Sequence, residues 1–234
     1  MLLLFYYSCA ISTQYDSSNY FCFFLLSSVF SSAETTIKVV DQFDQPLADA
    51  VVSFVLKGEQ ARGAMSSTPY LMDQVNKAFL PHVLVVPKGA KVSFPNSDDI
   101  RHHVYSFSEA KTFELKLYHG LPKAPLDFSE PGIMVLGCKI HDSMVGYIYV
   151  YDDKPAIRIS ALGLVTMPYA KEQFEAITIW HARAKIGVDC LRTIKIDDLK
   201  FVNGNAEITL EVNPPEKRDS FENLFSDLPQ GDKL

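Results

Sequence analysis

The chain has 234 residues, of which 47% are hydrophobic and 21% are charged, and its formal net charge at pH 7 is -6. This composition excludes a disordered chain as the default, and the length allows one or two β domains with their own cores. A negative net charge without a run of Lys or Arg gives no electrostatic footprint for nucleic acid or for an anionic membrane surface, and it suits a basic partner protein better.

Residues 1–33 differ from the remainder because they are rich in Phe, Leu, Tyr and Ser, with an apolar run from Phe21 to Leu26. Small residues at Ser31 and Ala33 precede an ordinary soluble sequence, which predicts a secretory signal cleaved after Ala33 and export to the periplasm. An upstream start codon or an uncleaved anchor are the alternatives, since no Lys or Arg precedes the apolar run. The apolar run is much shorter than the roughly 20 residues of a membrane span, so no stable span is expected after cleavage.

The next predicted elements are strands 37–40 and 50–56, joined by a turn-rich segment and therefore predicted to form a hairpin. Gly, Ser and Pro residues then predict a linker or long loop over 57–70. Residues 80–94 predict two strands around a Pro-Lys-Gly turn.

Further strands are predicted at 104–107 and 112–117. An apolar run over 133–138 and an alternating segment over 145–151 predict two strands on either side of a short loop.

Pro155 marks a boundary, and β signals follow it at 157–165, 174–180, 193–196 and 206–212. The remaining segment, 213–234, is Pro-rich and charged, and is predicted to be a mobile tail. No long amphipathic helix is expected. The fold class predicted from these patterns is all-β.

The short loop carries the chemistry. Cys138, His141 and Met144 supply a thiolate, an imidazole and a thioether, which are three of the four ligands of a mononuclear copper site. The second imidazole should come from another strand, where His102 and His103 are both available. Neighbouring strand residues face opposite sides, so only one of the two can point into the site. For Met144, burial in the core is the alternative to axial ligation.

Cysteine usage leaves one competing interpretation. Cys9 and Cys22 would be removed with the signal, so Cys138 and Cys190 would be the two thiols of an exported chain, and a disulfide between them is the alternative to copper. A disulfide would explain neither His141 nor Met144. If copper is bound, Cys190 is expected to be a lone, buried thiol.

The loop Cys138-x-x-His141-x-x-Met144 resembles the short ligand loop of amicyanin, and residues about 71–152 resemble a cupredoxin, the blue-copper family that includes plastocyanin. The family order of an Asn, a first His ligand and His-x-Val matches Asn96, His102 and Val104, and favours His102 over His103. The resemblance implies a Greek-key β-sandwich over 65–152 that holds one copper. It also implies that Asn96 hydrogen-bonds the ligand loop, with turn formation as its alternative role.

The wider chain resembles exported bacterial proteins labelled methylamine utilisation proteins, in which a plastocyanin-like segment is joined to a carboxypeptidase-regulatory-like β-sandwich. The stretch that begins at Asp41 and the segment from Phe174 to His181 carry that likeness. It implies that residues 34–58 and 154–212 form the second sandwich and that the cupredoxin-like segment is inserted into it.

Asp142 stands beside His141, and a carboxylate there would favour a protonated ring if copper released it after reduction. His82, His119 and His181 have no partner at metal-ligand spacing and are expected to be structural or surface residues.

The resulting functional hypothesis is a periplasmic type 1 copper protein that shuttles single electrons through Cu(I)/Cu(II), a carrier rather than an enzyme. The resemblance implies redox partners such as a periplasmic dehydrogenase or a cytochrome. The alternatives are a copper carrier or sensor without redox turnover, and a β-sandwich that binds another ligand.

Overall fold

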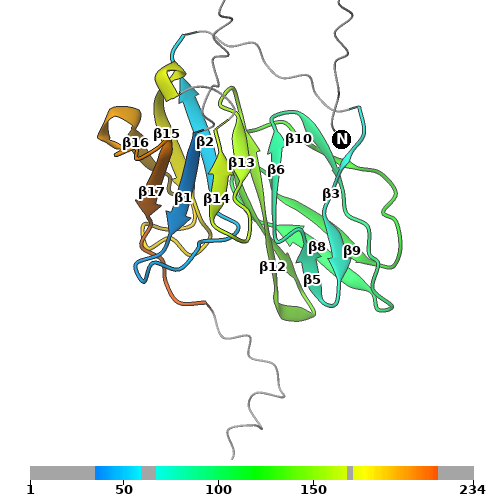
Figure 1. The fold of residues 1–234 in the computed structure, drawn as a ribbon. Coiled ribbons are helices and arrows are strands. Elements are labelled where there is room, and N and C mark those ends of the chain that lie inside the picture. Colours follow the sequence, from blue (N-terminus) through cyan, green and yellow to red (C-terminus); the bar gives the residue numbers. More distant parts are fainter. Residues whose placement is uncertain (1–34, 59–66, 168–170, 216–234) are drawn as a thin grey trace, which may run out of the picture. The chain divides into compact units, whose positions relative to one another are not determined.

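The structure is a computed structural model that describes residues 35–58, 67–167 and 171–215, all within one compact unit, residues 33–234. The proposed signal and its cleavage site lie outside the described residues, as does most of the proposed tail. The all-β prediction is confirmed: the described residues form strands together with two three-residue 3₁₀ turns, η1 (Lys171–Gln173) and η2 (Ile196–Asp198) (Figure 1). Within this part of the chain, no helix has the length and apolar character that crossing a membrane requires.

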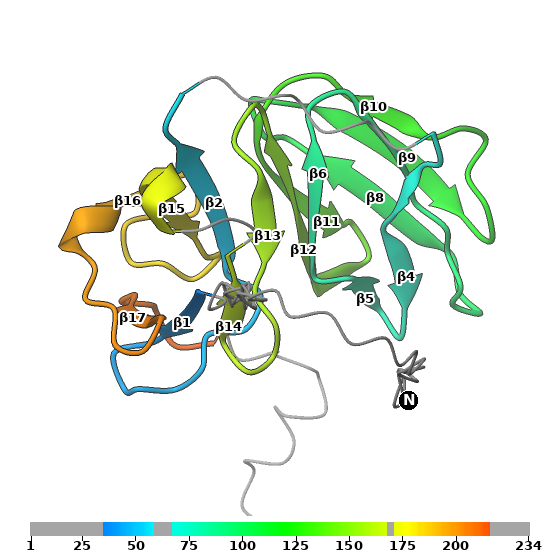
Figure 2. The ribbon, with the colours of Figure 1, turned by 45° about the horizontal axis from the view of Figure 1, so that its top comes forward.

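The segment from Tyr70 to Tyr151 forms a two-sheet sandwich, which we call the inserted sandwich. One sheet has the order β6-β12-β11-β8-β9 and the other β10-β7-β3, beside a β4-β5 hairpin (Figure 2). Its strands are β3 (Tyr70–Leu71), β4 (Asp73–Val75), β5 (Ala78–Leu80), β6 (Val83–Pro87), β7 (Ala90–Ser93), β8 (His102–Ser106), β9 (Phe113–Tyr118), β10 (Leu126–Phe128), β11 (Gly132–Cys138) and β12 (His141–Tyr151).

The core of the inserted sandwich follows from alternation along its strands. In β12, Ile148 and Val150 point inward and join the core that includes Phe94 and Phe128. Strands β6 and β12 pair in parallel, whereas β11 and β12 form an antiparallel hairpin. Burial of these apolar side chains is the main stabilising term. The sandwich thereby supplies a rigid frame for the hairpin end at residues 138–141.

The segments on either side of the insertion pair with each other, and we call this part the outer sandwich. Its sheets have the orders β14-β1-β17 and β13-β2-β15-β16. Its strands are β1 (Thr36–Val40), β2 (Val51–Leu56), β13 (Ala156–Arg158), β14 (Leu164–Thr166), β15 (Phe174–Trp180), β16 (Arg192–Lys195) and β17 (Asn205–Thr209). The outer sandwich has its own core, which contains Phe54 and Phe174. Its likeness to a carboxypeptidase-regulatory-like domain stays a prediction.

The predicted hairpin between 37–40 and 50–56 is wrong. Both strands exist, but β1 pairs with β14 and β17, whereas β2 pairs with β13 and β15. The turn between them therefore connects two sheets, and both strands find their partners more than 100 residues away along the chain.

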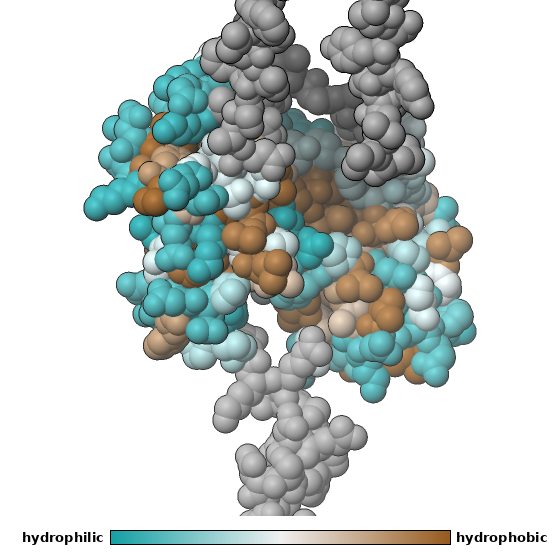
Figure 3. All heavy atoms as spheres, viewed as in Figure 1, coloured by the Kyte–Doolittle hydropathy of each residue, from teal (hydrophilic) through white to brown (hydrophobic). Residues whose placement is uncertain are grey.

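An aromatic cluster lies between the cores of the two sandwiches. Trp180, which is fully buried, contacts Tyr147 edge-on with ring centroids 5.5 Å apart, and its ring centroid lies 5.9 Å from that of Tyr149. The Tyr149 hydroxyl lies 3.1 Å from the Ser53 hydroxyl of β2. Tyr149 is therefore buried, whereas Tyr147 is partly exposed. Figure 3 shows hydrophobic and hydrophilic residues interspersed on one face of the molecule.

Candidate metal centre

Cys138 and His141 are brought together by the β11-β12 hairpin. The register pairs Cys138 directly with His141, and Lys139 and Ile140 form the turn between them. The register shifts between Gly137 and Cys138, because Gly137 pairs with Val145 whereas Cys138 pairs with His141. The local fold therefore places the thiol and the imidazole on the same side of the hairpin end.

His102 enters the same site from the first residue of β8. The pairing of Gly137 with Tyr105 sets β8 next to β11, so that the beginning of β8 lies near the end of β11. The His102 side chain is fully buried. Because the chain reaches β8 only after the loop over 96–101, this ligand comes from a segment that is distant in sequence from the hairpin.

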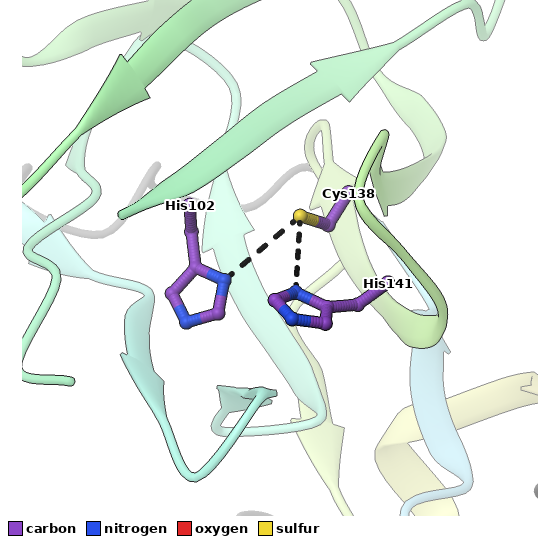
Figure 4. Close-up of side chains that lie close together, drawn as sticks. All are labelled: His102, Cys138 and His141. Atoms are coloured by element: carbon purple, nitrogen blue, oxygen red, sulfur yellow. Dashed lines mark hydrogen bonds between the residues drawn. The ribbon is translucent and has the colours of Figure 1, made fainter. Parts of the chain in front are cut away.

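The three side chains converge on one small volume, as Figure 4 shows. The Cys138 Sγ lies 3.9 Å from Nδ1 of His102 and 3.7 Å from Nδ1 of His141. All three potential donor atoms lie within 4.8 Å of one another. A metal ion among these donors could reach all of them, because zinc, for example, bonds thiolate sulfur and imidazole nitrogen at about 2.0–2.3 Å. The spacing therefore fits one metal ion.

Met144 lies three residues beyond His141 in β12, and its side chain is only 1% exposed. The thioether is thus buried in the same apolar cluster as the Cys138 thiol. One thiolate, two imidazoles and a thioether form the donor set that selects copper and gives a type 1 site its weak axial bond.

The second nitrogen of His102 is also engaged. Its Nε2 lies 2.6 Å from Oδ2 of Asp98, which leaves Nδ1 directed at Cys138. Metal-bound histidines commonly donate their other ring N–H to a carboxylate or a carbonyl, which fixes the tautomer. Asp98 was not predicted as a site residue, although it stands four residues before His102 in the segment Asn-Ser-Asp-Asp.

His103 lies on the opposite face of β8 and outside the cluster. Its Nε2 lies 2.8 Å from Oε1 of Glu114, and Lys139 Nζ donates to the same oxygen at 2.8 Å. Lys139, followed by His103, lowers the pKa of Glu114 to about 2. His103 is therefore bonded to Glu114, which also accepts from Lys139, and His102 is the residue that the structure directs at Cys138.

The environment of His141 favours its neutral, ligand-competent form. Burial lowers the pKa of this partly exposed ring, and the neighbouring His102 and Lys77 act in the same direction, whereas Asp98 opposes them. A neutral imidazole keeps the lone pair that a metal needs. Asp142 is exposed and is not among the groups that shift the His141 pKa, so the carboxylate that acts on this ring is Asp98.

Asn96 has partners other than the predicted ligand loop. Its Nδ2 donates to the carbonyl oxygens of Ile100 and Tyr118, at 2.9 and 2.8 Å, and its Oδ1 accepts from the Asp98 backbone N–H. One amide hydrogen thus bonds inside the segment that leads to His102, and the other bonds the last residue of β9. Asn96 shapes the 96–102 loop, which is closer to the turn-forming alternative.

Cys138 and Cys190 do not form a disulfide. Both thiols are free, and the Cys138 sulfur faces the two histidines. The expectation that Cys190 is buried is wrong, since it is exposed. Cys190 follows Asp189 in a turn-rich segment before β16, so it does not belong to a strand with a buried face.

Comparisons with known proteins give structural neighbours but no relative at the level of sequence. No family model and no curated protein matches the chain. Among solved structures, it is similar to a copper-containing nitrite reductase from Thermus scotoductus SA-01, with 26% identity and a TM-score of 0.35 over 49% of this chain. The match spans only 28% of that reductase.

Two further solved structures are similar to part of this chain. A purple cupredoxin from Nitrosopumilus maritimus is 22% identical over 35% of this chain and 96% of its own, with a TM-score of 0.31. A reduced amicyanin variant is 20% identical over 43% of this chain and 98% of its own, also with a TM-score of 0.31. The case for a copper site therefore rests on this chain's own residues.

Proposed function

We propose that this protein binds one copper ion at His102, Cys138, His141 and Met144 as a type 1 site, and that it transfers single electrons. The observation that carries the proposal is the convergence of the three nitrogen and sulfur donors within 4.8 Å, beside a buried Met144. Bound copper would supply the one-electron chemistry of the Cu(I)/Cu(II) couple.

The protein's own contribution is a fixed, dry arrangement of donors. Cys138 and Met144 are 3% and 1% exposed, and His102 is fully buried, so water has little access to three of the four donors. Strands β8, β11 and β12 hold these residues, and a sheet moves less than a loop. A site that cannot rearrange serves both oxidation states with little reorganisation, as an electron carrier requires.

His141 is the ligand nearest to solvent. Its side chain is partly exposed, whereas those of His102 and Cys138 are buried. An electron would therefore enter or leave through the exposed edge of the His141 ring. Partners that meet this edge would be one-electron redox proteins, such as a dehydrogenase or a cytochrome. Export to the periplasm and a place in amine oxidation are parts of the same proposal, and they rest on residues 1–33 and on the family resemblance.

The direct test is a Cu(II) titration of the copper-free protein, followed by visible absorption and EPR. A type 1 site gives an intense thiolate-to-copper band and a narrow copper hyperfine splitting, with one equivalent bound. Cys138→Ser should abolish the band. Cys190→Ser is the matched control, since it removes the other free thiol, and it should leave the spectrum unchanged.

Voltammetry then distinguishes an electron-transfer function from a copper-delivery function. A reversible one-electron wave, with copper retained against a Cu(I) chelator, supports electron transfer. Rapid loss of copper to the chelator after reduction would instead support a delivery role. Absence of a thiolate-to-copper band in the wild type would overturn the copper assignment and favour a β-sandwich with another ligand.

A further inference from the structure

Asp98 is placed to act on copper through His102 without being a ligand. Its Oδ2 lies 2.6 Å from Nε2 of His102, and the side chains are 10% and 0% exposed. The contact is therefore shielded from water. Hydrogen bonds between a charged and a neutral partner strengthen when solvent is excluded.

Three further contacts fix the Asp98 carboxylate and its backbone. The backbone N–H of Asn76 donates to Oδ1 at 2.6 Å, and that of Lys77 donates to Oδ2 at 2.9 Å. Both donors lie in the β4-β5 turn, where Asn76 and Lys77 have φ values of 52° and 57°. Asn96 Oδ1 accepts from the Asp98 backbone N–H at 3.1 Å. The left-handed turn thus presents two N–H groups to one carboxylate.

The carboxylate is held in its charged form by these donors. The backbone N–H groups of Asn76 and Lys77 donate to its two oxygens. Hydrogen bonds donated to a carboxylate favour its charged form. A fixed negative charge therefore sits against the far nitrogen of a ring whose near nitrogen faces Cys138.

We propose that Asp98 is a positioning residue that locks His102 with Nδ1 towards Cys138 and biases the bound copper towards Cu(II). The second half rests on the proposed function, whereas the orientation of the ring does not. A carboxylate on the outer nitrogen makes the imidazole a stronger donor. It also places negative charge near the metal, and this charge stabilises the more highly charged Cu(II) ion over Cu(I).

The first measurement uses the copper-free protein. Nitrogen-15 NMR of the histidine rings at pH 8, where an ordinary imidazole is neutral, should show His102 wholly as the Nε2–H tautomer. Asp98→Ala removes the acceptor and should give a mixture of tautomers. Asp99→Asn is the matched control, because it removes a neighbouring exposed carboxylate, and it should leave His102 unchanged. A wild-type ring protonated at Nδ1, or a tautomer unaffected by Asp98→Ala, would overturn the orienting role.

The second measurement is the reduction potential of the copper-loaded protein. Asp98→Asn should raise the potential by at least about 59 mV, the equivalent of a tenfold change in the ratio of Cu(II) to Cu(I) affinity. Asp99→Asn should shift it much less, since that charge does not reach a ligand. Equal shifts of the reduction potential in the two variants would show that the loss of any nearby negative charge has the same effect, and would contradict the proposal.

The two measurements also distinguish a failure of the proposed function from a failure of the role proposed for Asp98. If the wild type forms no type 1 site while the NMR result holds, the proposed function fails and the orientation of His102 by Asp98 stands. If the site forms but neither readout responds to Asp98, only the role of Asp98 is wrong. Unfolding curves of each variant should show a native fold, and Asp98→Asn, the smaller change, is measured by NMR as well if Asp98→Ala does not fold.

Discussion

His102 and His103 are consecutive residues with opposite surroundings. His102 Nδ1 lies 3.9 Å from Cys138 Sγ, whereas His103 Nε2 lies 2.8 Å from Glu114 Oε1 on the other face of β8. Alternation of a β-strand imposes this separation. One position therefore faces the candidate metal centre and the other contacts Glu114, although the two residues are the same amino acid.

His102→Gln and His103→Gln should consequently have different effects on copper binding. The first removes a donor atom and should abolish the thiolate-to-copper band or lower Cu(II) affinity by at least tenfold. The second leaves all four proposed ligands in place and should keep the band and the stoichiometry. Titration followed by absorption spectroscopy measures both. Loss of the band in His103→Gln alone would show that the wrong histidine has been assigned.

Two glycines in the same hairpin predict different packing costs. A Cβ at Gly146 would lie 2.7 Å from the Cβ of Phe79, which is 2% exposed and cannot move aside. Overpacking of this kind costs about 1–3 kcal/mol, so Gly146→Ala should lower the free energy of unfolding by about 2 kcal/mol.

A Cβ at Gly137 would also lie 2.7 Å from its nearest neighbours, but these are the ring end and hydroxyl of the half-buried Tyr105. That end of the side chain can shift, so Gly137→Ala should cost less than Gly146→Ala. Guanidinium unfolding of both variants makes the comparison. A larger loss at Gly137 would mean that the Tyr105 ring is fixed more rigidly than its partial exposure indicates.

The contact between the two sandwiches can be measured at Tyr149 and Ser53. Their hydroxyls lie 3.1 Å apart and the residues are 7% and 3% exposed. Tyr149→Phe leaves the Ser53 hydroxyl without this partner and should lower the free energy of unfolding by about 1–2 kcal/mol. A double-mutant cycle with Ser53→Ala should give a coupling of about 0.5–1.5 kcal/mol. Strict additivity of the two substitutions would show that the hydrogen bond contributes nothing.

Local sequence signals predicted what local geometry determines. The apolar run before Cys138 and the alternation after Met144 predicted β11 and β12, and a hairpin necessarily brings Cys138 close to His141. The all-β class followed from the same patterns. By contrast, the choice of strand partners is a long-range matter, and the pairing of β1 with β17, across more than 160 residues, is invisible in the local pattern.

The roles of side chains in loops could not be predicted from the sequence either. The role of Asp98 could not be predicted, because its link to His102 depends on how the segment before His102 folds against the β4-β5 turn. The exposure of Cys190 could not be predicted for a similar reason, because this residue lies in an irregular segment without alternation of apolar and polar residues. Patterns of alternation report which face of an element is buried, and they carry no such information for irregular segments.

His181 makes the stability of the copper-free protein depend on pH. Burial, together with the nearby Arg183, lowers its pKa to about 4, and its Nδ1 accepts a hydrogen bond from the Arg183 backbone N–H at 3.2 Å. In the unfolded chain the ring titrates near its ordinary value of about 6.5. As the pH falls from about 6.5 towards 4, the His181 ring becomes protonated in the unfolded state but stays neutral in the folded state. Stability is therefore fully present above about pH 6.5 and is lost through this window, by about 2 kcal/mol between pH 7.5 and pH 5.

The check is to measure the free energy of unfolding at both pH values for the copper-free wild type and for His181→Gln. The variant should lose about 2 kcal/mol less than the wild type between pH 7.5 and pH 5, because it has no ring to protonate in the unfolded chain. His119→Gln is the control, since His119 is exposed and meets water in the folded state as well. It should keep the wild-type difference. If His181→Gln keeps that difference too, the acid sensitivity arises elsewhere, and the buried ring of His181 does not resist protonation.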